Sequence, residues 1–332
     1  MIAAFFRLRR LIQQGLDRSD TVALSHWLHH FVEHRLCLIL DLSEGKDDPP
    51  VVSEQERSEQ AVSAQTVKAF VEASLRACGY EGWQVGLDHR VDGLYVHTET
   101  RRVLLSATRF TLTEVRRLLA HELAGRVART FAGEHAPLGL LGIGTQGHAA
   151  TEEGIGWSYE REALARQGLP CSDVALWCGT LATGLANGVV GLPQTFWSLH
   201  AFFERLLLLD RRLSRPREER QAAQRQARRQ ALARCLRTYR GVPDLTQGEV
   251  CLLQDVAPLR GWQQIERAVA ADATVLDRLA AGNIAYALLP VLQSLLPVPP
   301  PQPLRELAAD PDLDQFILSF ETTRENAGET VW

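Results

Sequence analysis

The chain has 332 residues, of which 45% are hydrophobic and 23% charged, proportions that are ordinary for a folded globular protein. Its formal net charge of −4 gives no reason to expect nucleic acid or an anionic membrane as the main partner. The six cysteines are scattered and form no C-x-x-C pair, as is typical of free thiols in a reducing compartment. The sequence lacks a convincing secretion signal, so we expect a cytoplasmic protein.

The first sixty residues predict two helices and a loop. Residues 2–16 have the pattern of a short amphipathic helix. The helical segment Thr21–Leu42 contains an i,i+4 histidine pair, His30 and His34, which has two interpretations, a metal site or an exposed helix face; we favour the exposed face. Asp41–Ser53 is acidic and is interrupted by Gly45, Pro49 and Pro50, and this composition predicts a loop.

A helix and a small sheet are expected next. Ser63–Cys78 has helical periodicity and is followed by Gly79, which can end a helix. Three short segments with roughly alternating polarity then predict strands, and the glycine turn between the first two predicts an antiparallel meander. The three strand segments are Trp83–Asp88, Leu94–Thr98 and Arg102–Ser106.

The helix that follows carries the residues of greatest chemical interest. Thr111 and Glu114 have the spacing of a capping box, and apolar residues recur at helical intervals from Leu112 onward. This periodicity places His121 and Glu122 inside the helix. A His-Glu pair in a helix is typical of zinc peptidases, in which the imidazole binds the metal and the glutamate takes a proton from the metal-bound water.

The position of a second histidine ligand is occupied by other residues. In H-E-x-x-H the second histidine would be at Gly125, and in H-E-x-x-x-H it would be at Arg126. Five residues of an ideal α-helix turn through roughly 500°, so residues i and i+5 point about 140° apart. An H-E-x-x-x-H site therefore requires a locally widened turn such as a π-bulge, and Gly125 would tolerate one.

The segments His121–Arg126 (HELAGR) and Thr151–Ile155 (TEEGI) resemble the microtubule-associated tyrosine carboxypeptidases and their bacterial relatives, the QEGLA-motif proteins. The resemblance implies that His121 is the first zinc ligand, Glu122 the general base and Glu153 the third ligand. Arg126 stands at the second ligand position. Two loop histidines, His148 and His135, are candidates to replace the missing ligand, and His148 is the better placed because it precedes Glu153 by five residues.

The second half of the chain predicts mainly helices. Thr151 is the expected N-cap of the first, which also gives the acidic pair Glu152 and Glu153 a structural alternative as favourable charges in the first turn. Further helices are expected at roughly 172–188, 194–213, 217–239, 247–257, 261–270, 273–281 and 284–295. Val174–Leu192 has no charged side chain over 19 residues, but its glycines favour a helix packed inside a domain over a membrane span.

Arg237, Tyr239 and Arg240 lie in a segment that is strongly basic. The simplest interpretation of this segment is a solvent-exposed face of a helix. The family resemblance places a basic cluster near the catalytic cleft, and it implies that Tyr239 and Arg240 take part in catalysis while Arg237 and Arg126 bind the substrate carboxylate.

These patterns predict a mostly helical α+β fold, with a small antiparallel sheet beside the His-Glu helix and a helical bundle after it. We expect one metallopeptidase-like domain over residues 1–295, divided into 1–110 (helices and sheet), 111–168 (site) and 169–295 (helices), followed by a proline-rich linker and tail, 296–332.

Two functions remain open. One is a zinc-dependent carboxypeptidase that acts on a peptide or protein C-terminus. The other is an inactive pseudopeptidase in which Arg126 pairs with Glu122 or Glu153 in place of Zn²⁺ and the cleft binds a peptide or carboxylate.

Overall fold

The computed structural model describes residues 60–326, apart from 92, 170, 172–173, 190–191, 215–219, 293 and 297–300. The expectations for 2–16, for the histidines of Thr21–Leu42 and for Asp41–Ser53 lie outside these residues. The fold is α+β and mostly helical, as predicted. The chain divides into two compact units, unit 1 with Met1–Glu54 and Asp173–Val256, and unit 2 with Gln55–Ser172 and Ala257–Trp332. The single domain expected over residues 1–295 stays a prediction.

Unit 2 begins with a short strand and the helix predicted from Ser63. Strand β1 (Ala61–Val62) pairs antiparallel with β5 (Phe110–Thr111). Helix α4 (Ala64–Ala77) has Ser63 as its N-cap, and the Ser63 side chain accepts a hydrogen bond from the Thr66 amide. Gly79 follows the helix with φ of +77°, a conformation that glycine adopts without strain. Local capping chemistry therefore fixed both ends of this helix.

The three predicted strands are present, but one pairing was predicted wrongly. Strands β2 (Gln84–Leu87), β3 (Leu94–His97) and β4 (Arg102–Leu105) form a sheet of order β2-β4-β3. β3 and β4 are antiparallel, whereas β2 pairs parallel with β4 and not with β3. The reason is burial: Val103 and Leu105 are 0% exposed, so the strand with the most buried side chains takes the central position.

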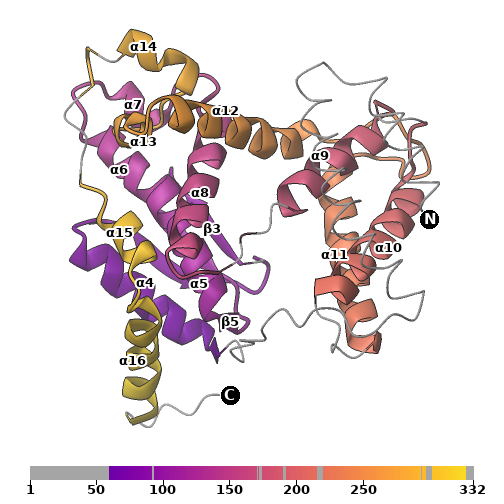
Figure 1. Ribbon diagram of the computed structural model, residues 1–332, viewed down its shortest axis with the longest axis horizontal. Helices are drawn as coiled ribbons and strands as arrows, with labels where there is room; N and C mark the ends of the chain where they lie inside the picture. The colour runs from indigo at the N-terminus through magenta and orange to yellow at the C-terminus, as the bar shows by residue number, and fades with distance from the viewer. Residues whose placement is uncertain are drawn as a thin grey trace. The chain divides into compact units, whose positions relative to one another are not determined.

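A continuous helical rod follows the sheet (Figure 1). It consists of α5 (Leu112–Leu118), a π-helix η2 (Leu119–Val127) and α6 (Ala128–Glu134). Both hydrogen bonds of the predicted capping box at Thr111 and Glu114 are present. The glycine-rich stretch after the rod is not entirely loop, because it contains α7 (Leu140–Ile143), and α8 (His148–Ala165) already begins at His148.

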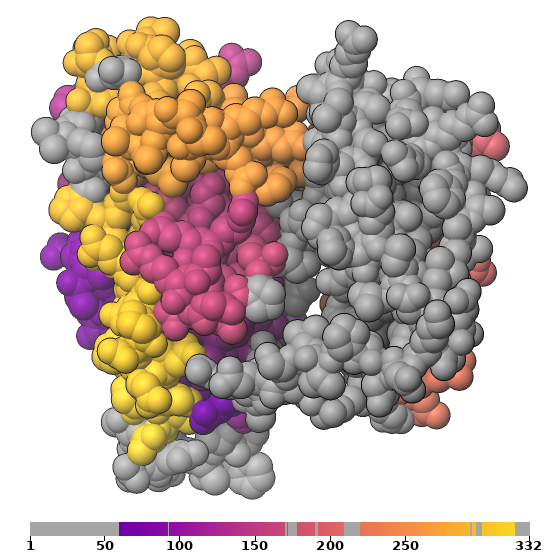
Figure 2. Space-filling model, in the orientation of Figure 1, coloured from indigo at the N-terminus to yellow at the C-terminus, as the bar shows by residue number. Residues whose placement is uncertain are grey.

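Helices α8 and α12 (Ala257–Ala271) cross at two glycines. A Cβ at Gly261 would lie 1.7 Å from the Ala150 carbonyl oxygen, and one at Gly154 would lie 2.3 Å from the Gly261 oxygen. Only glycine permits so close an approach. Figure 2 shows α12, in orange, lying directly across α8, in magenta. The remaining elements of this part are α13 (Val275–Leu279), η4 (Tyr286–Leu288) and α14 (Leu289–Leu292).

The predicted tail is part of unit 2 over residues 303–326. It forms α15 (Pro303–Ala309) and α16 (Leu313–Asn326), which pack against the N-terminal helices of the unit. The buried Arg116 guanidinium donates to the Ala308 and Asp310 carbonyl oxygens at 2.8 and 2.7 Å, and it pairs with Asp314. These long-range contacts could not be predicted from local sequence.

The described part of unit 1 is helical. It contains α9 (Val174–Ala186), α10 (Phe196–Ser214), α11 (Arg220–Thr238) and the short 3₁₀ helix η3 (Leu253–Val256). The prediction of a helix over 247–257 was wrong except for η3. Of the helices in the part of the chain that the structure describes, none has the length and apolar character needed to cross a membrane.

Candidate functional site

The His-Glu segment lies in a π-helix, which is the widened turn that an H-E-x-x-x-H spacing requires. η2 spans Leu119–Val127 and so includes His121, Glu122 and Arg126. In a π-helix the backbone hydrogen bonds join residues i and i+5, which brings His121 and Arg126 to the same side. Both side chains contact Glu153 of α8. The distortion is thus present although an arginine occupies the last position.

Helix α8 presents one face to η2. Glu153, Gly156, Trp157 and Glu160 follow each other at i, i+3, i+4 and i+7, the spacing of residues on one helical face. A Cβ at Gly156 would lie 2.8 Å from the His121 imidazole, and the Trp157 ring meets the imidazole edge to face at 5.9 Å. Gly156 therefore sets the short distance between the two helices at the imidazole.

Arg126 lies among three carboxylates. Its Nη1 is 2.8 Å from Glu122 Oε2, its Nε is 3.0 Å from Glu152 Oε1, and its Nη2 donates to Glu153 Oε1. Burial alone would lower the pKa of the guanidinium, but the neighbouring carboxylates raise it, so the group keeps its charge. A permanent cation with 19% side-chain exposure thus occupies the centre of the acidic cluster.

His121 is also held as a cation. Its Nε2 is 3.6 Å from Glu153 Oε2 and its Nδ1 is 3.5 Å from Glu160 Oε2. Burial would lower the pKa of the imidazole, but the two glutamates and the charge of Glu122 raise this pKa to about 10. Burial also raises the pKa of Glu122, against the opposing effect of Arg126. Both ring nitrogens therefore face carboxylates, an environment that favours the protonated imidazole.

These contacts form a chain of alternating charges. Its order is Arg117–Glu160–His121–Glu153–Arg126–Glu122, with Glu152 and Arg129 as a branch from Arg126. Four cations face four carboxylates once His121 is protonated. The network is therefore neutral as a whole, which is the condition under which buried charges are tolerated.

The residues as they stand do not fit a zinc ion. Zinc needs a free imidazole nitrogen and free carboxylate oxygens, but both nitrogens of His121 face glutamates, and Glu153 contacts both His121 and Arg126. His148 lies at the start of α8 with Nδ1 2.9 Å from the Thr145 carbonyl oxygen, and His135 Nδ1 is 2.8 Å from the Phe131 oxygen. Within the residues that the structure covers, no three His, Cys, Asp or Glu side chains are grouped so that they could hold a metal ion.

The predicted N-cap role of Thr151 was wrong. α8 begins one turn earlier at His148, and the Thr151 hydroxyl accepts a hydrogen bond from the Tyr286 amide at 2.9 Å. Glu152 and Glu153 are consequently not in the first turn of the helix, and their partners are the arginine and histidine of η2. Ion pairing, rather than capping, explains the acidic pair.

The three residues predicted from the basic segment, Arg237, Tyr239 and Arg240, belong to unit 1. The buried Tyr239 hydroxyl donates to the Gln194 carbonyl oxygen, and Arg237 pairs with Asp255, which also lies 3.0 Å from Arg234. Arg240 is exposed at the end of α11. All the contacts described for Tyr239 and Arg237 join α11 to other segments of unit 1, so they have a structural explanation that does not depend on a ligand.

Sequence reasoning missed Arg129 in the branch of the charge chain and two members of the chain itself. Glu160 follows Glu153 by seven residues, two turns of the same helix, and Arg117 precedes His121 by four residues. Both spacings place the residue on the same face as its partner. That signal was present in the sequence, but it becomes informative only when the facing helix is known.

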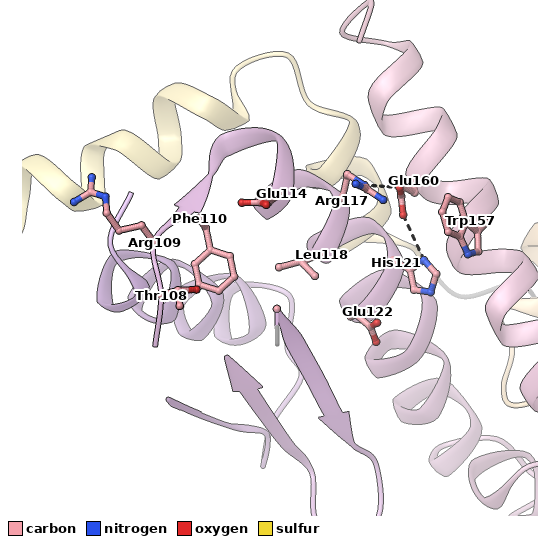
Figure 3. Close-up of a pocket in the computed structure, with 11 residues that line it drawn as sticks. Thr108, Arg109, Phe110, Glu114, Arg117, Leu118, His121, Glu122, Trp157 and Glu160 are labelled. Atoms are coloured by element: carbon pink, nitrogen blue, oxygen red, sulfur yellow. Dashed lines mark hydrogen bonds and ion pairs between the residues drawn. The ribbon is translucent and has the colours of Figure 1, made fainter. Parts of the chain in front are cut away.

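A pocket of about 390 Å³ adjoins this network (Figure 3). Its walls come from the residue that precedes β3, from the β5 strand with the segment before it, and from α5, η2 and α8. The lining residues are Gly93, Thr108, Arg109, Phe110, Glu114, Arg117, Leu118, His121, Glu122, Trp157 and Glu160. The pocket is large enough for a small organic ligand.

Comparison with known proteins provides no assignment. No protein-family model matches the chain, and no curated protein matches its sequence.

Proposed function

We propose that unit 2 is a metallopeptidase-like binding domain in which Arg126 takes the place of the metal and the adjoining pocket binds a peptide or another carboxylate-bearing ligand without hydrolysing it. The proposal takes up the resemblance of His121–Arg126 and Thr151–Ile155 to the tyrosine carboxypeptidases and the QEGLA-motif proteins. One observation carries it, the position of the Arg126 guanidinium between Glu122, Glu152 and Glu153.

The guanidinium supplies the charge of a metal but not its chemistry. A catalytic zinc lowers the pKa of a bound water and keeps one coordination position open. The donors of Arg126 contact three carboxylates, and a guanidinium offers no position at which water becomes acidic. Glu122, the predicted general base, uses Oε2 to accept from Arg126. The cluster is therefore balanced in charge and has no group that generates a nucleophile.

Zinc-dependent carboxypeptidase activity stays a prediction. It would require Arg126 to leave the carboxylates and His121 to give up its contacts with Glu153 and Glu160. Removing the arginine from its partners would leave buried carboxylates without a cation until the metal arrived, which costs several kcal/mol. For this reason the arrangement of the side chains favours the pseudopeptidase over the enzyme.

Metal analysis tests the proposal. The wild-type protein, purified from zinc-supplemented cells and dialysed, should contain far less than one zinc per chain. Arg126→His should take up close to one equivalent, because it removes the competing cation and supplies an imidazole at the i+5 position of the π-helix. Adding Glu153→Ala to that variant should abolish the uptake.

A matched control is Arg166→His, which adds a histidine to the exposed end of α8 and should bind no zinc. Thermal unfolding of each variant verifies that it is folded. One equivalent of zinc in the wild-type protein, lost on Glu153→Ala, would overturn the proposal in favour of the enzyme.

A further inference from the structure

Helix α11 of unit 1 has a buried face made of small side chains. These residues recur at intervals of four, and they are Ala223, Ala227, Ala231 and Cys235. Residues four apart lie on the same side of a helix. The neighbours that pack against α11 are α10, which lies alongside it in Figure 1, and α9. One side of the helix is therefore used inside unit 1.

The opposite side of α11 carries a second regular row. Its members, alternately three and four residues apart, are Ala222, Arg225, Arg229, Leu232 and Leu236, and we name them the outer row. At about 100° per residue, this row points away from the buried alanines. The two arginines are exposed, and Leu232 and Leu236 are 39% and 56% exposed. Alternation of three and four is the a/d spacing of a helix that packs against another helix.

The outer row is also positively charged. Arg220–Thr238 contains six arginines and no acidic residue, in a chain whose formal net charge is −4. Arg234 and Arg237 pair with Asp255, whereas Arg225 and Arg229 form no ion pair with any residue that the structure describes. A partner with carboxylates opposite these two guanidinium groups would complement their charge.

The order of residue types along the row selects the class of partner. Exposed arginines alone would suit any polyanion, and phosphate contacts are made by charge without regard to apolar neighbours. Leu232 and Leu236, however, lie one turn apart in the middle of the exposed face, and a phosphate backbone offers them nothing to pack against. A second helix can bury both leucines and pair with both arginines, because its own a and d positions follow the same spacing.

We propose that the outer row of α11 docks an amphipathic helix of a partner protein, with acidic side chains opposite Arg225 and Arg229 and apolar side chains opposite Leu232 and Leu236. The row extends over 14 residues of rise, or about 21 Å, so a partner helix of about three heptads covers it. This inference goes beyond the proposed function and does not rest on it, because that function concerns unit 2.

Fluorescence anisotropy with a labelled synthetic helix tests the surface. The probe is a peptide of about three heptads with glutamate at the a and d positions of one half, leucine at those of the other half, and a remainder of zero net charge. It is made in both orders so that docking in either direction is detected. One order should bind the full-length protein with a micromolar Kd, and glutamine in place of the glutamates should weaken binding at least about tenfold.

Two neighbouring arginines provide matched variants. Arg229→Glu and Arg228→Glu make the same change of charge at adjacent exposed positions, but only Arg229 belongs to the outer row. Arg229→Glu should weaken binding at least about tenfold and Arg228→Glu at most about threefold. Likewise, Leu236→Ser should weaken binding, whereas Leu192→Ser, at a leucine of unit 1 that is 83% exposed and outside α11, should not.

Exchange of the charges gives a readout that a merely structural role would not move. The protein with both Arg225→Glu and Arg229→Glu should bind a peptide that has arginine in place of the glutamates, and the wild type should not. Circular dichroism verifies that each variant keeps its helices. If a variant does not fold, the comparison of the glutamate and glutamine peptides on the wild-type protein still decides.

The proposal is overturned if neither order of the peptide binds, or if Arg228→Glu and Arg229→Glu weaken binding equally. Binding of duplex DNA or of anionic vesicles that both arginine variants weaken equally, and that Leu236→Ser leaves unchanged, would identify a surface for polyanions instead. A wild-type dimer that Leu236→Ser dissociates would assign the surface to a second copy of this chain and not to a partner protein.

Discussion

Replacing Arg126 by methionine tests whether the guanidinium is the counter-ion of the buried acids. The substitution keeps most of the side-chain volume and removes the charge that contacts Glu122, Glu152 and Glu153. Removing one partner of a buried ion pair costs about 3–5 kcal/mol because the remaining charge is uncompensated. The Arg126 side chain is 19% exposed, so solvent screens part of this cost and we expect about 3 kcal/mol at pH 7.

The loss should depend on pH in a defined direction. Glu122 has a pKa raised above 4.5, chiefly by burial, and removing the arginine raises that pKa further. Between pH 4.5 and the raised value the native state binds more protons than the unfolded chain, so its stability falls as pH rises through that window. The difference between Arg126→Met and wild type should therefore be largest at pH 7 and shrink toward pH 4.5.

The assay must report on unit 2, because a chain of two units need not unfold in one step. Thermal unfolding in the presence of EDTA should show a decrease of roughly 6–12 °C for the transition of unit 2, at about 2–4 °C per kcal/mol. Hydrogen exchange measured by mass spectrometry should accelerate in η2 and α8. Arg126→Lys keeps the charge and should lose less. If Arg126→Met is as stable as the wild type at pH 7, the guanidinium is not the required counter-ion and the reasoning is refuted.

Three further predictions concern the surroundings of the site. Gly156→Ala should destabilise unit 2 by about 1–3 kcal/mol in urea unfolding, because the new methyl group would meet the His121 ring at 2.8 Å, while Gly139→Ala, with no atom within 4 Å, should have no such effect. Arg116→Met should accelerate hydrogen exchange over residues 303–326, since this buried guanidinium holds α15 and α16; unchanged exchange there would contradict the role. The wild-type protein should have a larger free energy of unfolding than His121→Gln, because folding raises the pKa of His121 from 6.5 to about 10. This difference should be fully present below pH 6.5 and should disappear as pH rises through about 10. A difference that grows with pH would contradict the prediction.

Local sequence patterns determined the helices whose ends are set by nearby residues. The capping box of Thr111 and Glu114 and the N-cap of Ser63 were predictable, because their hydrogen bonds join residues three positions apart. A widened turn between His121 and Arg126 was expected from the spacing of an H-E-x-x-x-H site, and the π-helix η2 provides one. Each of these features depends on residues within one or two turns of each other.

Features that join distant segments were decided by tertiary structure. The central position of β4, and so its pairing with β2, followed from which strand is most buried. The Thr151 hydroxyl, expected to cap a helix, accepts a hydrogen bond from the distant Tyr286 amide instead. The pairing of Arg126 with Glu122 or Glu153 was expected for a protein in which the arginine replaces the metal, and both pairs are present. The third partner, Glu152, was not expected, because it depends on how α8 lies against η2. The close packing of α8 against η2 depends on Gly156, because any larger residue there would meet the His121 ring. A glycine adds nothing to the hydrophobic periodicity of a sequence, so its role becomes visible only when the facing helix is known.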